Sequence, residues 1–300
     1  MMANKEFPLV TVCVITYNHN KFIKSALESI LEQRTSFWWN IIIADDFSTD
    51  GTTEIIKEFA SQYPDKIKLI LQNHNVGLNK NFIDLFGAAQ SKYVAFLDGD
   101  DVWSDPIRLE KQFHFLENNP EYAMVYGKHT LMDEAGIKKS YRKIPSYKSG
   151  YIFKDILLCK FLPPMAAALI RNSEVKKIYL NNNAPGIDFF LIASICKNNK
   201  VAFLNENYFC YRINNHSITN SQRPYMSDLF LKNIMLFHNE YPEFVKKGIK
   251  NFQQNQLYLI AEKEPTLKHF YLLVTNFRFS SIHIRQQLKC FLNLIIRNLK

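Results

Sequence analysis

The stretch Tyr93-Val94-Ala95-Phe96-Leu97-Asp98-Gly99-Asp100-Asp101 decides how the sequence is interpreted, because an apolar run ends there in three acids within four positions. Such a run predicts a buried strand that delivers carboxylates to the carboxyl edge of a sheet. Carboxylates this close repel each other unless a cation lies among them, so the stretch predicts a divalent metal with oxygen ligands. The alternative is a solvated acidic turn, since Asp and Gly are ordinary turn residues.

The same alternation of buried strand and helix runs through the chain before and after this stretch. Strands are predicted at residues 9–15, 41–44, 67–71 and 93–97, and helices at 22–31, 52–62, 79–89 and 108–116. Asn18 or Asn20 is expected to cap the first helix. The order predicts an α/β fold with a mostly parallel sheet and helices on both faces.

Polar residues follow three of these strands: Thr16-Tyr17, Asp45-Asp46 and Asp98–Asp101. Because the carboxyl ends of parallel strands meet at one rim, these residues are expected to share a binding site there. That coincidence favours a site over a solvated turn.

Glycine spacing excludes several nucleotide-binding classes. The chain has nine glycines, and none of them forms G-x-G-x-x-G, a P-loop or G-x-S-x-G. Dinucleotide oxidoreductases, P-loop kinases and α/β-hydrolases are therefore disfavoured. Any phosphate must be held by a metal and basic side chains.

Composition and charge limit the cellular location and the kinds of binding partner that are expected. The 300 residues are 47% apolar and carry a net charge of +9, with 12 basic and 5 acidic side chains in residues 223–300. No nucleic-acid motif is present, so an anionic membrane surface is the expected partner of this basic end. Five scattered cysteines indicate a reducing cytoplasm. Residues 8–15 are predicted to be a strand, not a signal peptide, and no apolar run is long enough to span a bilayer.

Motifs that follow one another in order carry a specific resemblance: Val12–Asn18, Ile43–Thr52, Asn75-Val76-Gly77, Phe96–Trp103, Gly186–Leu191 and Tyr211–Thr219. Over about residues 8–222 the chain resembles the family 2 inverting glycosyltransferases of GT-A fold. The resemblance implies transfer of a sugar from a UDP- or dTDP-sugar to a glycan or lipid-linked acceptor during synthesis of a bacterial surface polysaccharide.

The resemblance also implies roles for residues on the donor side. Thr16 and Tyr17 follow the first strand as donor-binding residues. Asp46 would accept the N3 proton of uracil or thymine, which cytosine lacks. Asp45 is expected either to take part in this contact with the base or to cap the segment that follows. Lys80 would reach the base or the diphosphate, although the family often has Arg-Asn slightly later, and the alternative is an exposed lysine.

A metal site is implied at the acidic stretch. Asp98 would face the ribose or the metal, and Asp100 would bind Mn²⁺ or Mg²⁺ between the diphosphate oxygens, with Asp101 as a further ligand. His216 would complete the site unless it is simply solvated. Arg212 is the second candidate for the phosphates, and Tyr211 is expected to pack.

Asp188 matches the general base of the family, which takes the acceptor proton as the oxygen attacks the anomeric carbon. It precedes an apolar helix, so the alternative is a helix cap. One base and one metal-stabilised leaving group imply single displacement with inversion. The acceptor segment is expected within residues 139–172.

Two other classes are weighed against this one. A sugar-1-phosphate nucleotidyltransferase has a similar sheet but uses a glycine-rich basic loop, which is absent here. In a degenerate binding module, four acids would not converge on one cleft: Asp46, Asp98, Asp100 and Asp188.

Two domains are expected: the transferase at residues 1–222 and a basic helical extension at 223–300. Within it, residues 282–300 predict an amphipathic basic helix that lies on an anionic membrane or packs on protein.

Overall fold

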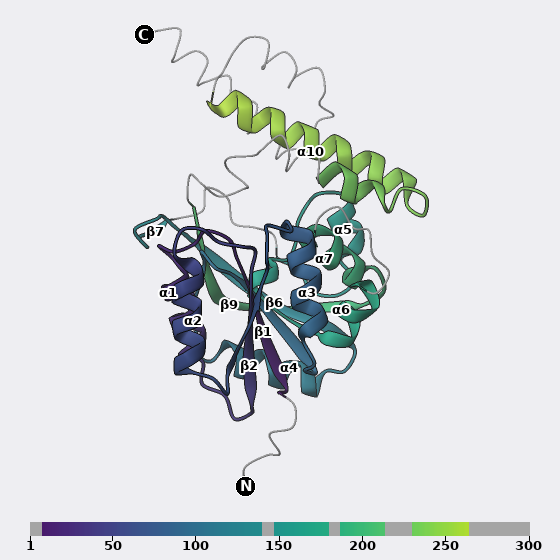
Figure 1. Cartoon of the computed structure of the whole chain (residues 1–300). Coiled ribbons are helices and arrows are strands. Elements are labelled where there is room, and N and C mark those ends of the chain that lie inside the picture. Colours follow the sequence, from purple (N-terminus) through teal and green to yellow (C-terminus); the bar gives the residue numbers. More distant parts are fainter. Residues whose placement is uncertain (1–7, 140–146, 180–186, 214–229, 264–300) are drawn as a thin grey trace. The chain divides into compact units, whose positions relative to one another are not determined.

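The computed structural model describes residues 8–139, 147–179, 187–213 and 230–263 (Figure 1). The chain divides into two compact units: residues 1–156 with 161–233, and residues 157–160 with 234–300. The expected boundary at residue 222 lies outside the described residues and stays a prediction.

The first unit is built on one mixed sheet with the strand order β3-β2-β1-β4-β8-β6-β9-β5, and β7 pairs with β6. Its strands are β1 (Val10–Thr16), β2 (Trp39–Asp45), β3 (Ile67–Leu71), β4 (Tyr93–Asp98), β5 (Val102–Trp103), β6 (Tyr122–Met132), β7 (Lys138–Lys139), β8 (Ala168–Arg171) and β9 (Lys200–Arg212). The first four strands in this order are parallel, as expected. Beyond them the sheet is mixed, because β8 runs antiparallel to both β4 and β6 while β9 runs parallel to β6.

Helices cover both faces of this sheet. They are α1 (Ile23–Leu31), α2 (Thr52–Gln62), α3 (Leu78–Ala88), α4 (Arg108–Asn118), α5 (Phe153–Leu157), α6 (Asn172–Tyr179) and α7 (Ile187–Asn198). In Figure 1, α1 and α2 lie together on one side of the sheet, and α3, α6 and α7 lie on the other. This arrangement agrees with the predicted layers.

The core forms where the sequence is apolar without alternation. All seven residues of β1 and all seven of β2 are buried, because helices cover both faces of these strands. The buried face of α1 consists of Ile23, Ala26, Leu27 and Ile30, at three- and four-residue spacing.

A buried arginine ties α4 to the segment before β8. Arg108 is 0% exposed, and its Nη1 and Nη2 donate to the carbonyl oxygens of Ala166 (2.7 Å) and Ala168 (3.2 Å). Its guanidinium carbon lies 4.0 Å from the centre of the Trp103 ring. Burial lowers the Arg108 pKa to about 9, so the group remains charged and its positive charge is balanced by carbonyl dipoles and a ring face.

The second unit contains α10 (Pro242–Lys263). Within it, Asn251 donates through Nδ2 to the carbonyl oxygen of Leu158 (2.8 Å). The predicted amphipathic helix at 282–300 lies outside the described residues. Among the described residues, no helix is long and apolar enough to cross a membrane.

Candidate functional site

The loops after β1 and β2 are bonded to each other across about 30 positions of sequence. Asn18 receives the Thr49 N–H at its Oδ1 (2.9 Å), and its own N–H donates to Ser48 Oγ (2.9 Å). The N–H of Asn20 donates to Asp50 Oδ2 (3.0 Å). The expected capping of α1 by Asn18 or Asn20 is therefore wrong: α1 has no side-chain cap, because both residues are used to join the two loops.

The two acids at the end of β2 have different partners. Asp45 accepts hydrogen bonds from the Ser48 N–H (3.3 Å) and from Thr53 Oγ1 (2.5 Å), so it serves the segment that follows, which is the capping alternative. Asp46 is buried, and its carboxylate accepts the N–H groups of Val76 (2.7 Å) and Gly77 (3.0 Å). The Asn75-Val76-Gly77 motif is thus held at the end of β2 by a charged acceptor.

Burial raises the pKa of Asp46, although the two N–H groups act in the opposite direction. Its main-chain N–H donates to the carbonyl oxygen of Thr16 (3.0 Å), which joins the ends of β1 and β2. Thr16 is itself buried, whereas Tyr17 is 43% exposed. The side chains predicted to bind the donor base therefore surround the junction of these two strands.

The acidic turn, by which we mean residues 98–101 at the end of β4, contacts the end of β1. The Gly99 N–H donates to the Ile15 carbonyl oxygen (2.9 Å). A Cβ atom at Gly99 would lie 2.8 Å from both Thr16 Oγ1 and His19 Nδ1, and those two atoms are 3.2 Å apart. Only glycine fits this approach without displacing Thr16 or His19. His19 was not predicted as a site residue, and its place in Thr-Tyr-Asn-His directly after a strand was the available signal.

The carboxylates of this turn disfavour one another's charge. The pKa of Asp98 is raised well above its ordinary value, first by burial and then by the charges of Asp101, Asp100 and Asp188. The pKa of Asp101 is raised by burial and by Asp100, against the opposing effect of Arg212. Asp101 is 1% exposed, and its buried Oδ2 has no hydrogen-bond partner among the described residues.

These features suit a divalent cation, which would offset the repulsion and give Asp101 Oδ2 a partner. Among the described residues, however, no group of three or more His, Cys, Asp or Glu side chains is arranged to hold a metal ion. His216, the remaining predicted ligand, lies outside the described residues. The oxygen donors fit Mn²⁺ or Mg²⁺, and the complete set of ligands stays a prediction.

Arg212 is placed against the acidic turn. Its main-chain N–H donates to Asp101 Oδ1 (2.7 Å), its Nε to the Asp100 carbonyl oxygen (2.7 Å), and its Nη1 to the Glu134 carbonyl oxygen (3.0 Å). Its guanidinium carbon lies 4.6 Å from the centre of the Phe22 ring. In this position, the residue predicted to hold phosphates fixes the backbone that presents the acids.

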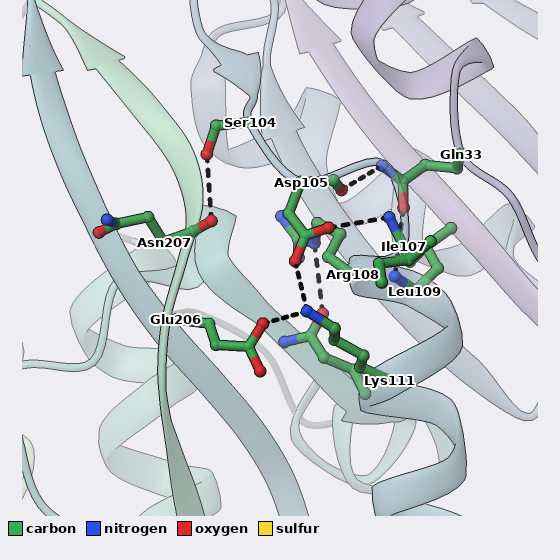
Figure 2. Close-up of polar contacts among 10 residues, drawn as sticks. Gln33, Ser104, Asp105, Ile107, Arg108, Leu109, Lys111, Glu206 and Asn207 are labelled. Carbon is green, nitrogen blue, oxygen red and sulfur yellow. Dashed lines mark hydrogen bonds and ion pairs between the residues drawn. The ribbon is translucent and has the colours of Figure 1, made fainter.

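The strand that carries Arg212 is braced against the start of α4. Figure 2 shows Lys111 between two carboxylates, those of Asp105 (3.0 Å) and Glu206. In the same view, Ser104 Oγ donates to the Asn207 carbonyl oxygen (3.2 Å). We call these contacts the α4–β9 brace. It was not predicted, because Lys111 and Glu206 are 95 positions apart in the chain.

Asp188 lies in the first turn of α7, as expected. It is exposed, yet enough protein surrounds it to raise its pKa to about 6 by disfavouring the charged form. Its charge also raises the pKa of Asp98, which places α7 near the acidic turn. The meeting of the predicted base and the predicted metal-binding acids in one active site stays a prediction.

Lys80, on α3, forms an ion pair with Asp84, one turn further along the same helix. Its side chain is 57% exposed, so the described contacts match the alternative of an exposed lysine. The predicted contact with the donor stays a prediction.

The mixed sheet with helices on both faces is the GT-A fold of glycosyltransferases, as the family model and the solved structures below show. The fold is shared with solved structures of low sequence identity. Staphylococcus aureus TarS residues 1–349, in complex with UDP-GlcNAc, matches with a TM-score of 0.62 at 16% identity over 89% of this chain and 79% of that one. Mannosyltransferase PcManGT from Pyrobaculum calidifontis, in complex with GDP-Man and Mn²⁺, matches with a TM-score of 0.58 at 15% identity over 98% and 87%.

The chain belongs to the family described as glycosyl transferase family 2, whose model matches residues 11–174. It is 32% identical over 212 residues to the uncharacterized protein Rv1520 of Mycobacterium tuberculosis, covering 71% of this chain and 61% of that protein. The chain thus spans less than two thirds of the length of this relative. The putative teichuronic acid biosynthesis glycosyltransferase TuaG of Bacillus subtilis is 28% identical over 216 residues, covering 72% and 83%.

Proposed function

We propose that this protein is a metal-dependent, inverting glycosyltransferase that moves a sugar from a UDP- or dTDP-sugar to a glycan or lipid-linked acceptor. The observation that carries the proposal is the meeting of three polar strand ends at one rim, where the Asp46 N–H donates to the Thr16 carbonyl oxygen (3.0 Å) and the Gly99 N–H to the Ile15 carbonyl oxygen (2.9 Å). Membership of family 2 favours transfer over the nucleotidyltransferase alternative. TuaG, named for teichuronic acid biosynthesis, supports a surface polysaccharide as the product.

Each side chain has a task in this reaction. Asp46 would accept the N3 proton of the pyrimidine, while Thr16, Tyr17, Lys80 and Asp98 would hold the rest of the donor. Asp188 would take the proton of the acceptor hydroxyl as its oxygen bonds to the anomeric carbon. In the same step the bond from that carbon to the diphosphate breaks, and its electron pair leaves with the nucleotide diphosphate.

Asp100, Asp101 and His216 would hold a divalent cation, whose charge would offset the negative charge of the leaving diphosphate. Arg212 would keep the turn in place through its bond to the Asp100 carbonyl oxygen. The Mn²⁺ complex of PcManGT supports this use of metal.

The proposal is tested by screening nucleotide-sugars for thermal stabilisation and slow hydrolysis, with and without Mn²⁺. We expect a UDP- or dTDP-sugar to stabilise the protein in the presence of Mn²⁺. If neither class stabilises it and neither is turned over, the assignment of the donor is wrong.

The metal assignment has its own test in Asp100→Ala. This variant should lose metal-dependent turnover of the donor, because the diphosphate would lose the main ligand of its counterion. Turnover is measured as released nucleotide across a Mn²⁺ titration. Activity within about tenfold of wild type, a barrier change of about 1.4 kcal/mol, would place the metal elsewhere.

A further inference from the structure

Phe47 combines two unfavourable features at the end of β2. Its φ is +64°, in the left-handed region that costs bulky residues energy through contact of Cβ with the backbone. Its side chain is also 48% exposed, so burial of the ring does not compensate. Strain of this kind persists where the surroundings enforce it, and it concentrates at functional sites.

The surroundings of Phe47 do enforce it. On one side, the Asp46 carboxylate is fixed by the N–H groups of Val76 and Gly77. On the other side, the N–H and Oγ of Ser48 both donate to Asp45 Oδ1. The chain must therefore reverse at Phe47, and it does so through the left-handed conformation.

The neighbouring loop has a similar arrangement. Asn18 has a φ of +57° and is bonded to Ser48, and the residue before it, Tyr17, is exposed. Two hydrogen-bonded loops therefore each carry an exposed aromatic ring beside a left-handed backbone. Asn adopts that conformation readily because its short polar side chain bonds locally, whereas Phe does not.

We propose that Phe47 is a donor-binding residue whose ring contacts the face of the same nucleobase whose N3–H is proposed to donate to Asp46. The inference rests on the proposed function. A base offers a flat, weakly hydrated face, and stacking on it removes ring surface from water. The fixed loop holds the ring in place before the donor arrives, so little side-chain freedom is lost on binding.

The test compares Phe47→Asn and Phe47→Tyr with wild type. Binding of UDP in the presence of Mn²⁺ is measured by calorimetry, and Tm is measured without ligand. Phe47→Asn should relieve strain and raise Tm by about 1–4 °C, while weakening UDP binding by about tenfold. Phe47→Tyr keeps the ring and should keep the affinity.

Two controls isolate the base. Tyr63→Asn removes an aromatic side chain of similar exposure, 42%, beyond the end of α2, and should leave UDP affinity unchanged. Pyrophosphate, which lacks a base, should compete equally well for wild type and Phe47→Asn.

The outcomes separate the inference from the proposed function. If wild type binds neither UDP nor dTDP, both are overturned. If wild type binds UDP and Phe47→Asn binds it equally well, the inference alone is overturned. A variant that weakens pyrophosphate and UDP to the same extent, or that raises the acceptor KM with unchanged UDP affinity, also overturns contact with the base.

Discussion

Gly99 joins the acidic turn to the end of β1 by close contact, so the space around it sets what the turn tolerates. A Cβ at this position would lie 2.8 Å from Thr16 Oγ1 and His19 Nδ1. Gly99→Ala should lower the free energy of unfolding by about 1–3 kcal/mol through overpacking, and should displace the acids enough to reduce turnover.

Thermal unfolding and donor turnover check this expectation against Gly87→Ala. Gly87 lies within α3, and no atom of the residues that the structure describes would lie within 4 Å of its added Cβ. The control should stabilise the helix by about 0.5–1 kcal/mol. Equal behaviour of the two variants would contradict the close packing of the turn.

Asp188 should give the reaction a pH dependence. Its pKa is raised from 3.8 to about 6 because the surrounding protein disfavours the charged form. A general base must be deprotonated, so kcat/KM should rise with pH through about 6 and then level off. Asp188→Asn should lose this limb and slow transfer by about 10²–10⁴, with donor affinity roughly intact.

The same shift has a consequence for stability, and its sign is set by the direction of the shift. An acid whose pKa is raised on folding stabilises the protein at pH below its ordinary value, and this stability is lost as pH rises through about 6. Asp188→Asn should therefore have a higher Tm than wild type at pH 7.5 and an equal one near pH 4. Weakened donor binding with normal turnover would instead make Asp188 a structural residue of the helix start.

At the scale of elements, Arg212 links β9 to the acidic turn through a set of directed bonds. Arg212→Lys keeps the charge but not the fork of donors that reaches the Asp100 and Glu134 carbonyl oxygens. If the residue acts by positioning, the variant should bind Mn²⁺ more weakly, by about tenfold, with a smaller change in donor KM. A tenfold weaker affinity for Mn²⁺ corresponds to the loss of about one charge-assisted hydrogen bond.

Turnover across a Mn²⁺ titration separates this from direct contact with phosphate. A lysine that restored normal metal dependence and turnover would show that charge alone suffices. The matched control is Lys111→Met in the α4–β9 brace, whose partly exposed ion pairs should contribute about 1 kcal/mol or less to stability.

How much could be predicted from the sequence depended on whether the pairing was local. The strands β1 to β4 were predicted within about two residues, and in β1, β2 and β4 the signal was the largely apolar run that burial on both faces leaves. The β9 strand, Lys200–Arg212, was not predicted, since its buried and exposed residues alternate irregularly. Its partner β6 is almost 80 positions away, and the register between them shifts three times.

The same reasoning applies to the candidate site. Acids at strand ends are visible in sequence because strand and turn are contiguous, and this gave Asp46 and Asp98. The partners of Asn18 and the position of Arg212 depend on contacts about 30 and 110 positions away. Local propensity carries no information about such contacts, so the capping role of Asn18 was mispredicted.

At the scale of the whole molecule, the basic end predicts an association with membranes. Residues after Glu264 include six Lys or Arg and no acid, and each basic residue near anionic lipid adds about 1 kcal/mol to binding. The intact protein should sediment with anionic vesicles at low salt. Deleting residues 282–300 should release it from the vesicles and leave Tm unchanged.

Neutral vesicles and high salt serve as controls, since the attraction is electrostatic. If the truncated protein unfolds, or the intact protein ignores anionic vesicles, the segment packs on protein instead. In either case a lipid-linked acceptor would have to reach the site without this anchor.

The buried Arg108 implies an order of events during synthesis of the chain. Its carbonyl partners, Ala166 and Ala168, are 58 and 60 positions later, so β1 to β4 and α4 leave the ribosome before Arg108 can donate to them. Burying this charge against Gln112 and the Trp103 ring, but without the two carbonyl acceptors, should cost up to about 3–5 kcal/mol. We expect a nascent chain of about 160 residues, which ends before both partners, to be degraded readily by protease and the Arg108→Met version to resist it. Equal sensitivity would mean that the early strands do not close around this position until later.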